Sequence, residues 1–198
     1  NDLADRWKIA GRYTNVTHML REEKLDAVII ATANDSHYRY AMQAMEKGLH
    51  VLCEKPLALN YKDAKEMADL AEAKSLITMT PFTYSFMPTT RYLKELIDSG
   101  YLGNPYHLNM RYYTSYGRNT DYIWRFDKGI AGSGAVGDIG SHFIYIAYLL
   151  FGEITGIFAK LDKLIERSKT TLEGKPYDLA DDTAMLIQKK KNGAQGTI

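Results

Sequence analysis

The chain has 198 residues, of which 45% are hydrophobic and 25% are charged, and its formal net charge is +1. This composition is typical of a globular protein that is long enough to bury a sizeable core. The near-zero charge gives no electrostatic reason to expect a nucleic acid or an anionic membrane as a partner. The single cysteine, Cys53, excludes an internal disulfide and favours a reducing, cytoplasmic location.

The sequence also predicts no transmembrane segment and shows no signal peptide. The most apolar long run, Ile139–Phe151, is interrupted by Gly140 and His142. It is shorter than the ~20 residues that a membrane span requires.

The first part of the chain alternates between short apolar strands and amphipathic helices. Asn1–Gly11 is expected to be the end of a helix or a loop, and Val16–Arg21 a short helical turn. Strands are then predicted at Leu25–Ala31, His50–Cys53 and Leu76–Thr80, and helices at Tyr38–Lys47 and Tyr61–Lys74. This alternation with short loops predicts a doubly wound parallel α/β sheet.

Two polar stretches follow strands of this predicted sheet. Thr32–His37 comes after the first strand and Glu54–Pro56 after the second. Because ligands collect at the carboxyl ends of the strands in such sheets, both stretches are expected to face one crevice.

The pattern changes near Pro81–Pro88, which predicts one domain over residues 1–82 and an α+β domain over residues 83–198. The second domain is expected to hold a helix at Thr89–Ser99 and half-exposed strands of an antiparallel sheet at Tyr106–Tyr113, Gly156–Leu164 and Thr183–Lys189. Asn192-Gly193 is a strong hairpin signal. The lysine run Lys189–Lys191 is therefore interpreted as a solvated hairpin end.

Asp138 and His142 stand at the start of an apolar helix pattern, in Gly132–Phe151. Positions i and i+4 share a helix face, so the two side chains can address the same small volume. Asp138 as a helix cap with His142 as a partly buried histidine is one alternative. A metal pair is another, although no further ligand has a familiar spacing. Lys55 likewise reads, in isolation, as a surface lysine before a turn proline.

Five segments, in this order, resemble the Gfo/Idh/MocA family of NAD(P)-dependent sugar and polyol oxidoreductases. They are A-T-A-N-D-S-H (Ala31–His37), C-E-K-P-L-A (Cys53–Ala58), D-S-G-Y-L-G (Asp98–Gly103), W-R-F-D (Trp124–Asp127) and G-S-G-A-V-G-D-I-G-S-H (Gly132–His142). The resemblance implies a partial Rossmann domain followed by an α+β domain with an open, largely antiparallel sheet. It also implies NAD or NADP as cofactor and a sugar, inositol or related polyol as substrate.

The resemblance further implies roles for single residues. The catalytic group would be Lys55, Asp138 and His142. The cofactor site would include Thr32, Asn34, His37, Glu54, Lys55, Trp124 and Arg125.

The chemistry asks for these residue types independently. Oxidation of a secondary alcohol needs a base such as His142, which at an unperturbed pKa of ~6.5 suits neutral pH. The carboxylate of Asp138 can orient the hydroxyl and stabilise imidazolium, and the ammonium of Lys55 can stabilise developing alkoxide charge.

Gly132–Gly137 spells G-x-G-x-x-G, but no strand or βαβ unit surrounds it, so it is not expected to be the dinucleotide fingerprint. We expect its glycines to allow close approach of the backbone to cofactor or substrate. The true fingerprint is absent, as is the residue that selects NAD or NADP. The sequence is therefore expected to be a fragment, or the ordered part, of a longer protein. We expect it to be incomplete at both of its ends.

Two other functions remain open: an NAD-dependent glycoside hydrolase on the same scaffold, and a non-catalytic binding protein. A stretch rich in tyrosine and arginine precedes Trp124 and could either contact a sugar ring or form sheet surface; it contains Tyr112, Tyr113, Tyr116, Tyr122, Arg111 and Arg118. An exposed sheet face in the second domain predicts a homo-oligomer.

Overall fold

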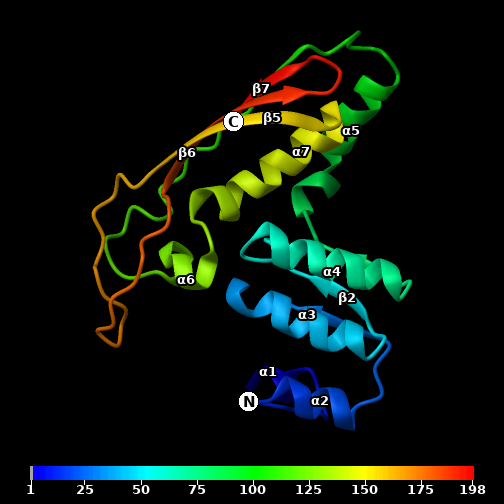
Figure 1. Ribbon diagram of the computed structural model, residues 1–198, viewed down its shortest axis with the longest axis vertical. Helices are drawn as coiled ribbons and strands as arrows, with labels where there is room; N and C mark the ends of the chain where they lie inside the picture. The colour runs from blue at the N-terminus through cyan, green and yellow to red at the C-terminus, as the bar shows by residue number, and fades with distance from the viewer. Residues whose placement is uncertain (1) are drawn as a thin grey trace. The chain divides into compact units, whose positions relative to one another are not determined.

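The computed structural model describes residues 2–198, and the chain divides into two compact units. The first unit contains the residues up to Thr32 together with Ser36–Thr80, and the second contains Ala33–Asp35 together with Pro81–Ile198. Figure 1 shows the elements of both units in chain order. Asn1, included in the first predicted segment, lies outside the described residues.

The first unit is built on a parallel three-stranded sheet in the order β1-β2-β3. The strands are β1 (Ala27–Ile30), β2 (His50–Cys53) and β3 (Thr78–Met79), and they are joined by α3 (His37–Glu46) and α4 (Tyr61–Ala73). Two further helices, α1 (Asp2–Arg6) and α2 (Val16–Glu22), precede β1. The predicted strand–helix alternation is confirmed, although β3 is shorter than Leu76–Thr80.

The core of the first unit lies between the sheet and the helices α3 and α4. It consists of Ile30, Ala41, Ala44, Met45, Val51, Cys53, Met67 and Ala71. Local signals fix the helix ends: the Asn60 side chain accepts a hydrogen bond from the Asp63 amide at 3.0 Å, and Gly48 follows α3 with a φ of +80°. Both positions were predicted from the sequence, because an asparagine cap and a C′ glycine are local preferences.

Cys53 is buried in this core, and burial raises the pKa of its thiol to about 12, with a smaller contribution from the carboxylate of Glu54. Since the thiolate is the reactive form, we expect a thiol reagent at about pH 8 to leave Cys53 unmodified in the native protein. Mass spectrometry of the Cys53 peptide, with the denatured protein as the labelling control, measures this. Rapid labelling under native conditions would contradict the burial of this side chain.

The second unit holds a four-stranded sheet in the order β4-β7-β6-β5. Its strands are β4 (His107–Asn109), β5 (Ile154–Asp162), β6 (Thr183–Lys190) and β7 (Gln195–Thr197). Its two longer helices are α5 (Pro88–Asp98) and α7 (Ser141–Phe151), and Figure 1 shows α7 alongside the sheet. The shorter helical turns are η1 (Asn34–Ser36), η2 (Thr83–Phe86), η3 (Trp124–Phe126), α6 (Lys128–Ala131) and the π-helical turn η4 (Val136–Gly140).

This sheet is mixed, which corrects one expectation. β6 pairs antiparallel with β5 and β7, and the β6–β7 hairpin turns at Gly193 with a φ of +89°, as predicted. However, β4 pairs parallel with β7 and covers three residues, whereas the sequence predicted an antiparallel strand over Tyr106–Tyr113. β7 offers β4 only three paired positions, and the alternating residues beyond them lie in an exposed connection.

The lysine run is only partly solvated, contrary to expectation. Lys189 and Lys191 are exposed, but Lys190 is 1% exposed and shares a sheet face with the buried Leu186 and Gln188. The period of two along a strand turns every second residue inward, which the count of consecutive lysines does not reveal. Burial lowers the pKa of Lys190 below its usual value.

The opposite sheet face exposes three large apolar side chains. Phe158 pairs with Ile187, and Met185 is opposite Lys160 in the next register position on that face. Clustered exposed apolar side chains are typical of interaction surfaces, so homo-oligomerisation stays a prediction.

One helical run, Lys128–Phe151, is long and apolar enough to cross a membrane by length and composition alone, a criterion that core helices of folded proteins also meet. The apolar run considered in the sequence, Ile139–Phe151, is shorter than this helical run, because helical turns also precede Ile139, in η4 and α6. Ile146, Ala147 and Leu150 of this run are buried. The absence of a membrane partner stays a prediction.

Candidate active site

The polar stretches after β1 and β2 are tied together by His37. Its ring is completely buried, with Nδ1 2.9 Å from the carbonyl oxygen of Pro56 and Nε2 3.1 Å from that of Thr32. The amide of Glu54 also donates to the carbonyl oxygen of Ile30 at 2.9 Å. The two stretches therefore lie at the same edge of the sheet, as their positions after parallel strands predicted.

This edge carries the polar groups that the sequence analysis assigned to the nicotinamide half of a dinucleotide site. The exposed Thr32 hydroxyl lies 2.6 Å from the hydroxyl of Ser36, and Glu54 and Lys55 are half-buried. The amide of Lys55 donates to Glu54 Oε2 at 3.1 Å, and the Lys55–Pro56 peptide bond is cis. His37 uses both ring nitrogens within the protein, so its visible role is to hold this edge together. Cofactor contacts of all these residues stay predictions.

Asn34, the remaining residue of the first stretch, belongs to the second unit. Its side-chain nitrogen donates to the carbonyl oxygen of Ala131, at the end of α6, at 3.1 Å. Trp124 and Arg125 lie on η3, a few residues before α6, and the Arg125 guanidinium carbon is 4.5 Å from the centroid of the Trp124 ring. The second unit thus places three of the predicted cofactor residues on and around α6.

Asp138 and His142 occupy successive turns of different kinds. Asp138 lies in the π-helical turn η4, and His142 lies in the first turn of α7. Single π-helical turns inside longer helices occur frequently at functional sites. The oxygen atoms that cap this helix start belong to Asp181 rather than to Asp138, because Asp181 accepts the amides of Gly134 and Val136.

His142 is 6% exposed and is surrounded by aromatic rings from η2 and the residue before it. Its ring stacks on Tyr84 at a centroid distance of 4.4 Å and meets the Phe82 ring edge-on at 5.8 Å. No sequence pattern indicated a contact between Tyr84 and His142, since the two are far apart in the chain. Stacking fixes the plane of the imidazole, which a general base requires.

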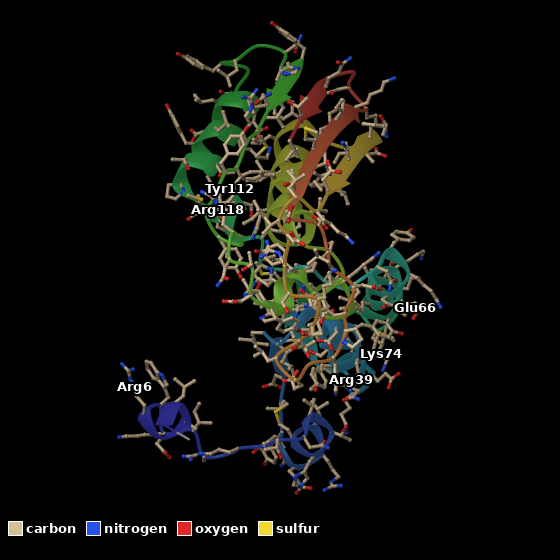
Figure 2. The ribbon with its side chains drawn as sticks, turned by 90° about the vertical axis from the view of Figure 1, so that its left-hand side faces the viewer. Arg6, Arg39, Glu66, Lys74, Tyr112 and Arg118 are labelled. Carbon is tan, nitrogen blue, oxygen red and sulfur yellow. The ribbon has the colours of Figure 1, made fainter. Side chains whose placement is uncertain are left out.

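A cavity of about 320 Å³ lies within the second unit, with Asp138 in its wall. The wall also contains Tyr112, Tyr113, Tyr116, Arg125 and Asp182. Figure 2 labels Tyr112, and also Arg118, on the chain that connects β4 to η3. The wall does not include Arg111, Arg118 or Tyr122, and the Tyr122 hydroxyl instead donates to Asp127 at 3.1 Å. The tyrosine-rich stretch therefore divides between the cavity and the surrounding structure.

Arg167 holds one wall of this cavity in place. Its guanidinium donates to the carbonyl oxygens of Gly117 and Asn119 and lies 3.8 Å from the centroid of the Phe126 ring. One of its nitrogens is 3.9 Å from Asp182 Oδ2, and both side chains are almost fully buried. This residue was not identified from the sequence, where it appears as one charged residue in a polar segment.

Contacts within the chain require glycine at two positions of the segment before Asp138. A Cβ on Gly134 would fall 2.8 Å from the carbonyl carbon of Asp181 and closer still to its oxygen, and one on Gly137 would overlap the Ser133 hydroxyl. We expected the glycines to allow approach to a cofactor or substrate. The close approach visible at Gly134 is to another backbone segment of the protein, and approach to a cofactor or substrate stays a prediction.

We expect Gly134→Ala to destabilise the full-length protein by about 3 kcal/mol, since the added carbon meets backbone that cannot rotate away. Gly140→Ala is the matched control, because a Cβ there would meet only ordinary contacts, the nearest at 3.6 Å. In a helical conformation that change is expected to be neutral or stabilising by about 0.5–1 kcal/mol. Denaturant unfolding measures both. Equal stability of the two variants would contradict the close packing at Gly134.

Within residues 2–198, no group of three or more histidine, cysteine, aspartate or glutamate side chains lies together so that it could hold a metal ion. Lys55 belongs to the first unit, whereas Asp138 and His142 belong to the second. The meeting of these three groups at one hydroxyl therefore stays a prediction.

Family models cover most of the chain. Residues 1–82 match the oxidoreductase family model with an NAD-binding Rossmann fold, and residues 90–198 match the GFO/IDH/MocA C-terminal domain.

Among curated relatives, levoglucosan dehydrogenase of Pseudarthrobacter phenanthrenivorans is 32% identical over 213 residues, covering 100% of this chain and 54% of its own length. Glucose-6-phosphate 3-dehydrogenase of Bacillus subtilis is 33% identical over 176 residues, covering 86% of this chain and 50% of its own. Myo-inositol 2-dehydrogenase of Thermotoga maritima is 26% identical over 197 residues, covering 100% and 56%. The chain thus spans about half the length of these relatives.

A solved structure of levoglucosan dehydrogenase in complex with NADH and levoglucosan superposes with a TM-score of 0.90 and 32% identity. That match covers 99% of this chain and 53% of the solved one. The segment order, the fold and both family models agree, and the chain belongs to the Gfo/Idh/MocA family of oxidoreductases.

Proposed function

We propose that this sequence is part of an NAD(P)-dependent dehydrogenase that acts on a secondary alcohol of an uncharged sugar, inositol or related polyol. The observation that carries the proposal is the cavity of about 320 Å³ in the second unit, whose wall combines the Asp138 carboxylate with tyrosine rings. Because the chain spans about half of its relatives' length, the proposal concerns the full-length protein. Three of the curated relatives are a levoglucosan, a glucose-6-phosphate 3- and a myo-inositol 2-dehydrogenase, which also favours a metabolic, cytoplasmic role.

The cavity supports a small polyhydroxylated substrate. Its volume is at the lower end of the ~300–1,000 Å³ typical of ligand pockets. Tyrosine rings offer apolar faces to the C–H side of a sugar and hydroxyls to its polar edge. Tyrosines aside, the charged wall residues are Asp138, Arg125 and Asp182, and Asp182 is itself paired with Arg167, which leaves no excess of positive charge. This balance disfavours a phosphorylated sugar, which would require an excess of positive charge.

The residues proposed to hold the cofactor lie in both units. Thr32, Glu54 and Lys55 follow the strands β1 and β2, and Trp124 and Arg125 lie on η3. The nicotinamide, when bound, supplies the hydride acceptor or donor. The protein's part is to place the reacting carbon of the sugar and to manage the proton.

We assign the proton steps to three side chains, those of His142, Asp138 and Lys55. The imidazole of His142 accepts the proton of the reacting hydroxyl as the C–H bond breaks, and the alcohol becomes a ketone. Asp138 orients the hydroxyl and stabilises the imidazolium that forms, and Lys55 Nζ stabilises the negative charge that develops on oxygen. In the opposite direction, protonated His142 returns the proton to the alkoxide.

The test is a substrate panel on the full-length protein with NAD and NADP, followed by the near-ultraviolet absorbance of the reduced cofactor. The panel contains levoglucosan, myo-inositol, glucose and glucose 6-phosphate. We expect reduction with at least one uncharged compound and a lower kcat/KM for the phosphate. Release of nitrophenol from a nitrophenyl glycoside without net reduction would overturn the proposal in favour of a glycoside hydrolase. No turnover of any compound would overturn the catalytic assignment.

A further inference from the structure

We propose that Asp181 is a positioning residue that fixes the helix start on which Asp138 is carried. The inference rests on the proposed function, because Asp138 has a catalytic part only within it. Asp181 belongs neither to the family motifs described above nor to the cavity wall.

Asp181 accepts three consecutive backbone amides through three different oxygen atoms. The amide of Gly134 donates to Oδ1 at 2.8 Å, and that of Val136 donates to Oδ2 at 2.9 Å. The amide of Ala135, between them, donates to the backbone carbonyl oxygen of Asp181 at 2.9 Å. One residue thus binds the amides of three successive residues at this helix start.

This arrangement replaces the local cap that most helices have. The first amides of a helix lack an intrahelical acceptor, and a side chain directly before the helix usually accepts one of them. Here neither Ala135, before η4, nor Gly140, before α7, supplies a capping side chain. The acceptor comes instead from a residue that is 45 positions further along the chain than Val136. The negative charge of Asp181 also lies at the positive end of the helix dipole, and this interaction stabilises the helix start.

The hydrogen bonds continue from Asp181 to Asp138. The Gly134 peptide donates its amide to Asp181, and its carbonyl oxygen accepts the amide of Asp138 at 2.9 Å. Because Gly134 also packs against the Asp181 backbone without room for a Cβ, the segment cannot shift without breaking these contacts. The position of Asp138 in the cavity wall is therefore coupled to Asp181.

Asp182 accepts backbone amides in a similar way on the other side of the cavity. Its two carboxylate oxygens accept the amides of Leu164 and Ile165, each at 2.9 Å, and Oδ2 lies 3.9 Å from Arg167. Successive residues of an extended chain point in opposite directions, so two adjacent carboxylates can reach separate segments. The Asp181-Asp182 pair connects the helix start to the segment that orders the tyrosine-rich wall.

The first measurement needs no variant. In the full-length wild-type protein, hydrogen exchange resolved to single residues is expected to show the amides of Gly134, Ala135 and Val136 protected, although the first amides of a helix ordinarily exchange fast. Exchange of these amides at the rate of exposed surface amides would overturn the proposal.

The second measurement compares Asp181→Asn with Asp127→Asn, a matched control. Each aspartate is 7% exposed and accepts an amide at a helix start, that of Gly129 at 2.9 Å in the case of Asp127. We expect Asp181→Asn to reduce the protection of Gly134 and Val136, whose amides donate to the side chain, more than that of Ala135, whose amide donates to the backbone carbonyl oxygen. We expect it to lower kcat by about 10²-fold, the cost that a misplacement of ~1 Å brings, with a smaller change in KM. Asp127→Asn is expected to lower the melting temperature without reducing the protection of residues 134–136, which separates a general loss of stability from the loss of the Asp181 contacts.

The two parts of the proposal fail separately from the proposed function. Unchanged kcat in Asp181→Asn, or an equal loss of protection at residues 134–136 in both variants, would overturn the positioning role. If Asp181→Asn does not fold, the wild-type exchange pattern still decides whether Asp181 caps this helix. Failure of the wild type to turn over any sugar would instead overturn the proposed function, while the exchange result would stand by itself.

Discussion

Replacing His142 with glutamine in the full-length protein is expected to lower kcat for alcohol oxidation by about 10²–10⁴-fold, the usual contribution of a general base. Glutamine preserves polarity and approximate size but cannot accept the proton. The loss should appear in kcat and in the pH dependence of the rate, because a titrating base has been removed. Steady-state kinetics across pH, with the substrate found in the panel, measures both.

The control for this variant is His18→Gln. His18 lies on α2, its side chain is 53% exposed, and its ring is 3.6 Å from the carboxylate of Glu22 on the same helix. Its replacement is expected to leave kcat unchanged. Tyr84→Phe keeps the ring stacked beside His142 and removes only the hydroxyl, so it is expected to leave kcat close to that of the wild type. A His142→Gln protein with wild-type kcat would show that the base is another group.

Replacing Arg167 with methionine is expected to destabilise the protein by about 3–5 kcal/mol, the usual cost of breaking a buried ion pair. The change leaves the carbonyl oxygens of Gly117 and Asn119 without their guanidinium donor and removes the cation beside Asp182. Gly117 and the Asp182 side chain are buried, whereas Asn119 is exposed, and water cannot replace the hydrogen bond lost at Gly117 without opening the cavity wall. Denaturant unfolding followed by circular dichroism gives the free energy.

Lys191→Met is the matched control for this comparison. Lys191 Nζ lies 2.9 Å from Glu153 Oε2 in the same unit, but the two side chains are 74% and 58% exposed. Exposed ion pairs typically contribute about 0–1 kcal/mol, so the control should stay close to the wild type. If both variants lost the same free energy of unfolding, the burial of Arg167 would not increase its contribution to stability. A further expectation is that Arg167→Met raises KM for the sugar, because Tyr116 and Phe126 then lose their support.

The strands and helices of the first unit could be predicted from the sequence because the signals for them are local. His50–Cys53 is a strand at its predicted boundaries, and α4 begins after the predicted cap at Asn60. Each depends on residues within a few positions of one another: a short apolar run or a capping side chain. The Asn192-Gly193 turn was identifiable for the same reason, since a two-residue hairpin signal needs no distant partner.

The second unit shows where local signals fail. The parallel pairing of β4 with β7 depends on which distant strand is adjacent, and alternation along Tyr106–Tyr113 cannot report this. The inward side chain of Lys190 depends on strand register, so three consecutive lysines do not indicate a solvated end. In both cases the residues are compatible with several arrangements, and only packing selects one.

By itself, the sequence determined the family, the strand–helix order of the first unit and the residue types that the chemistry requires, because motifs and periodicities are short-range properties of the chain. The tertiary structure decided what holds those residues in place. Tyr84 stacks on His142, Arg167 supports the tyrosine wall, and Asp181 caps the helix start from 45 positions beyond Val136. These contacts join segments far apart in the chain, and a carboxylate or guanidinium acquires such a role only when folding removes it from water and leaves it one set of partners.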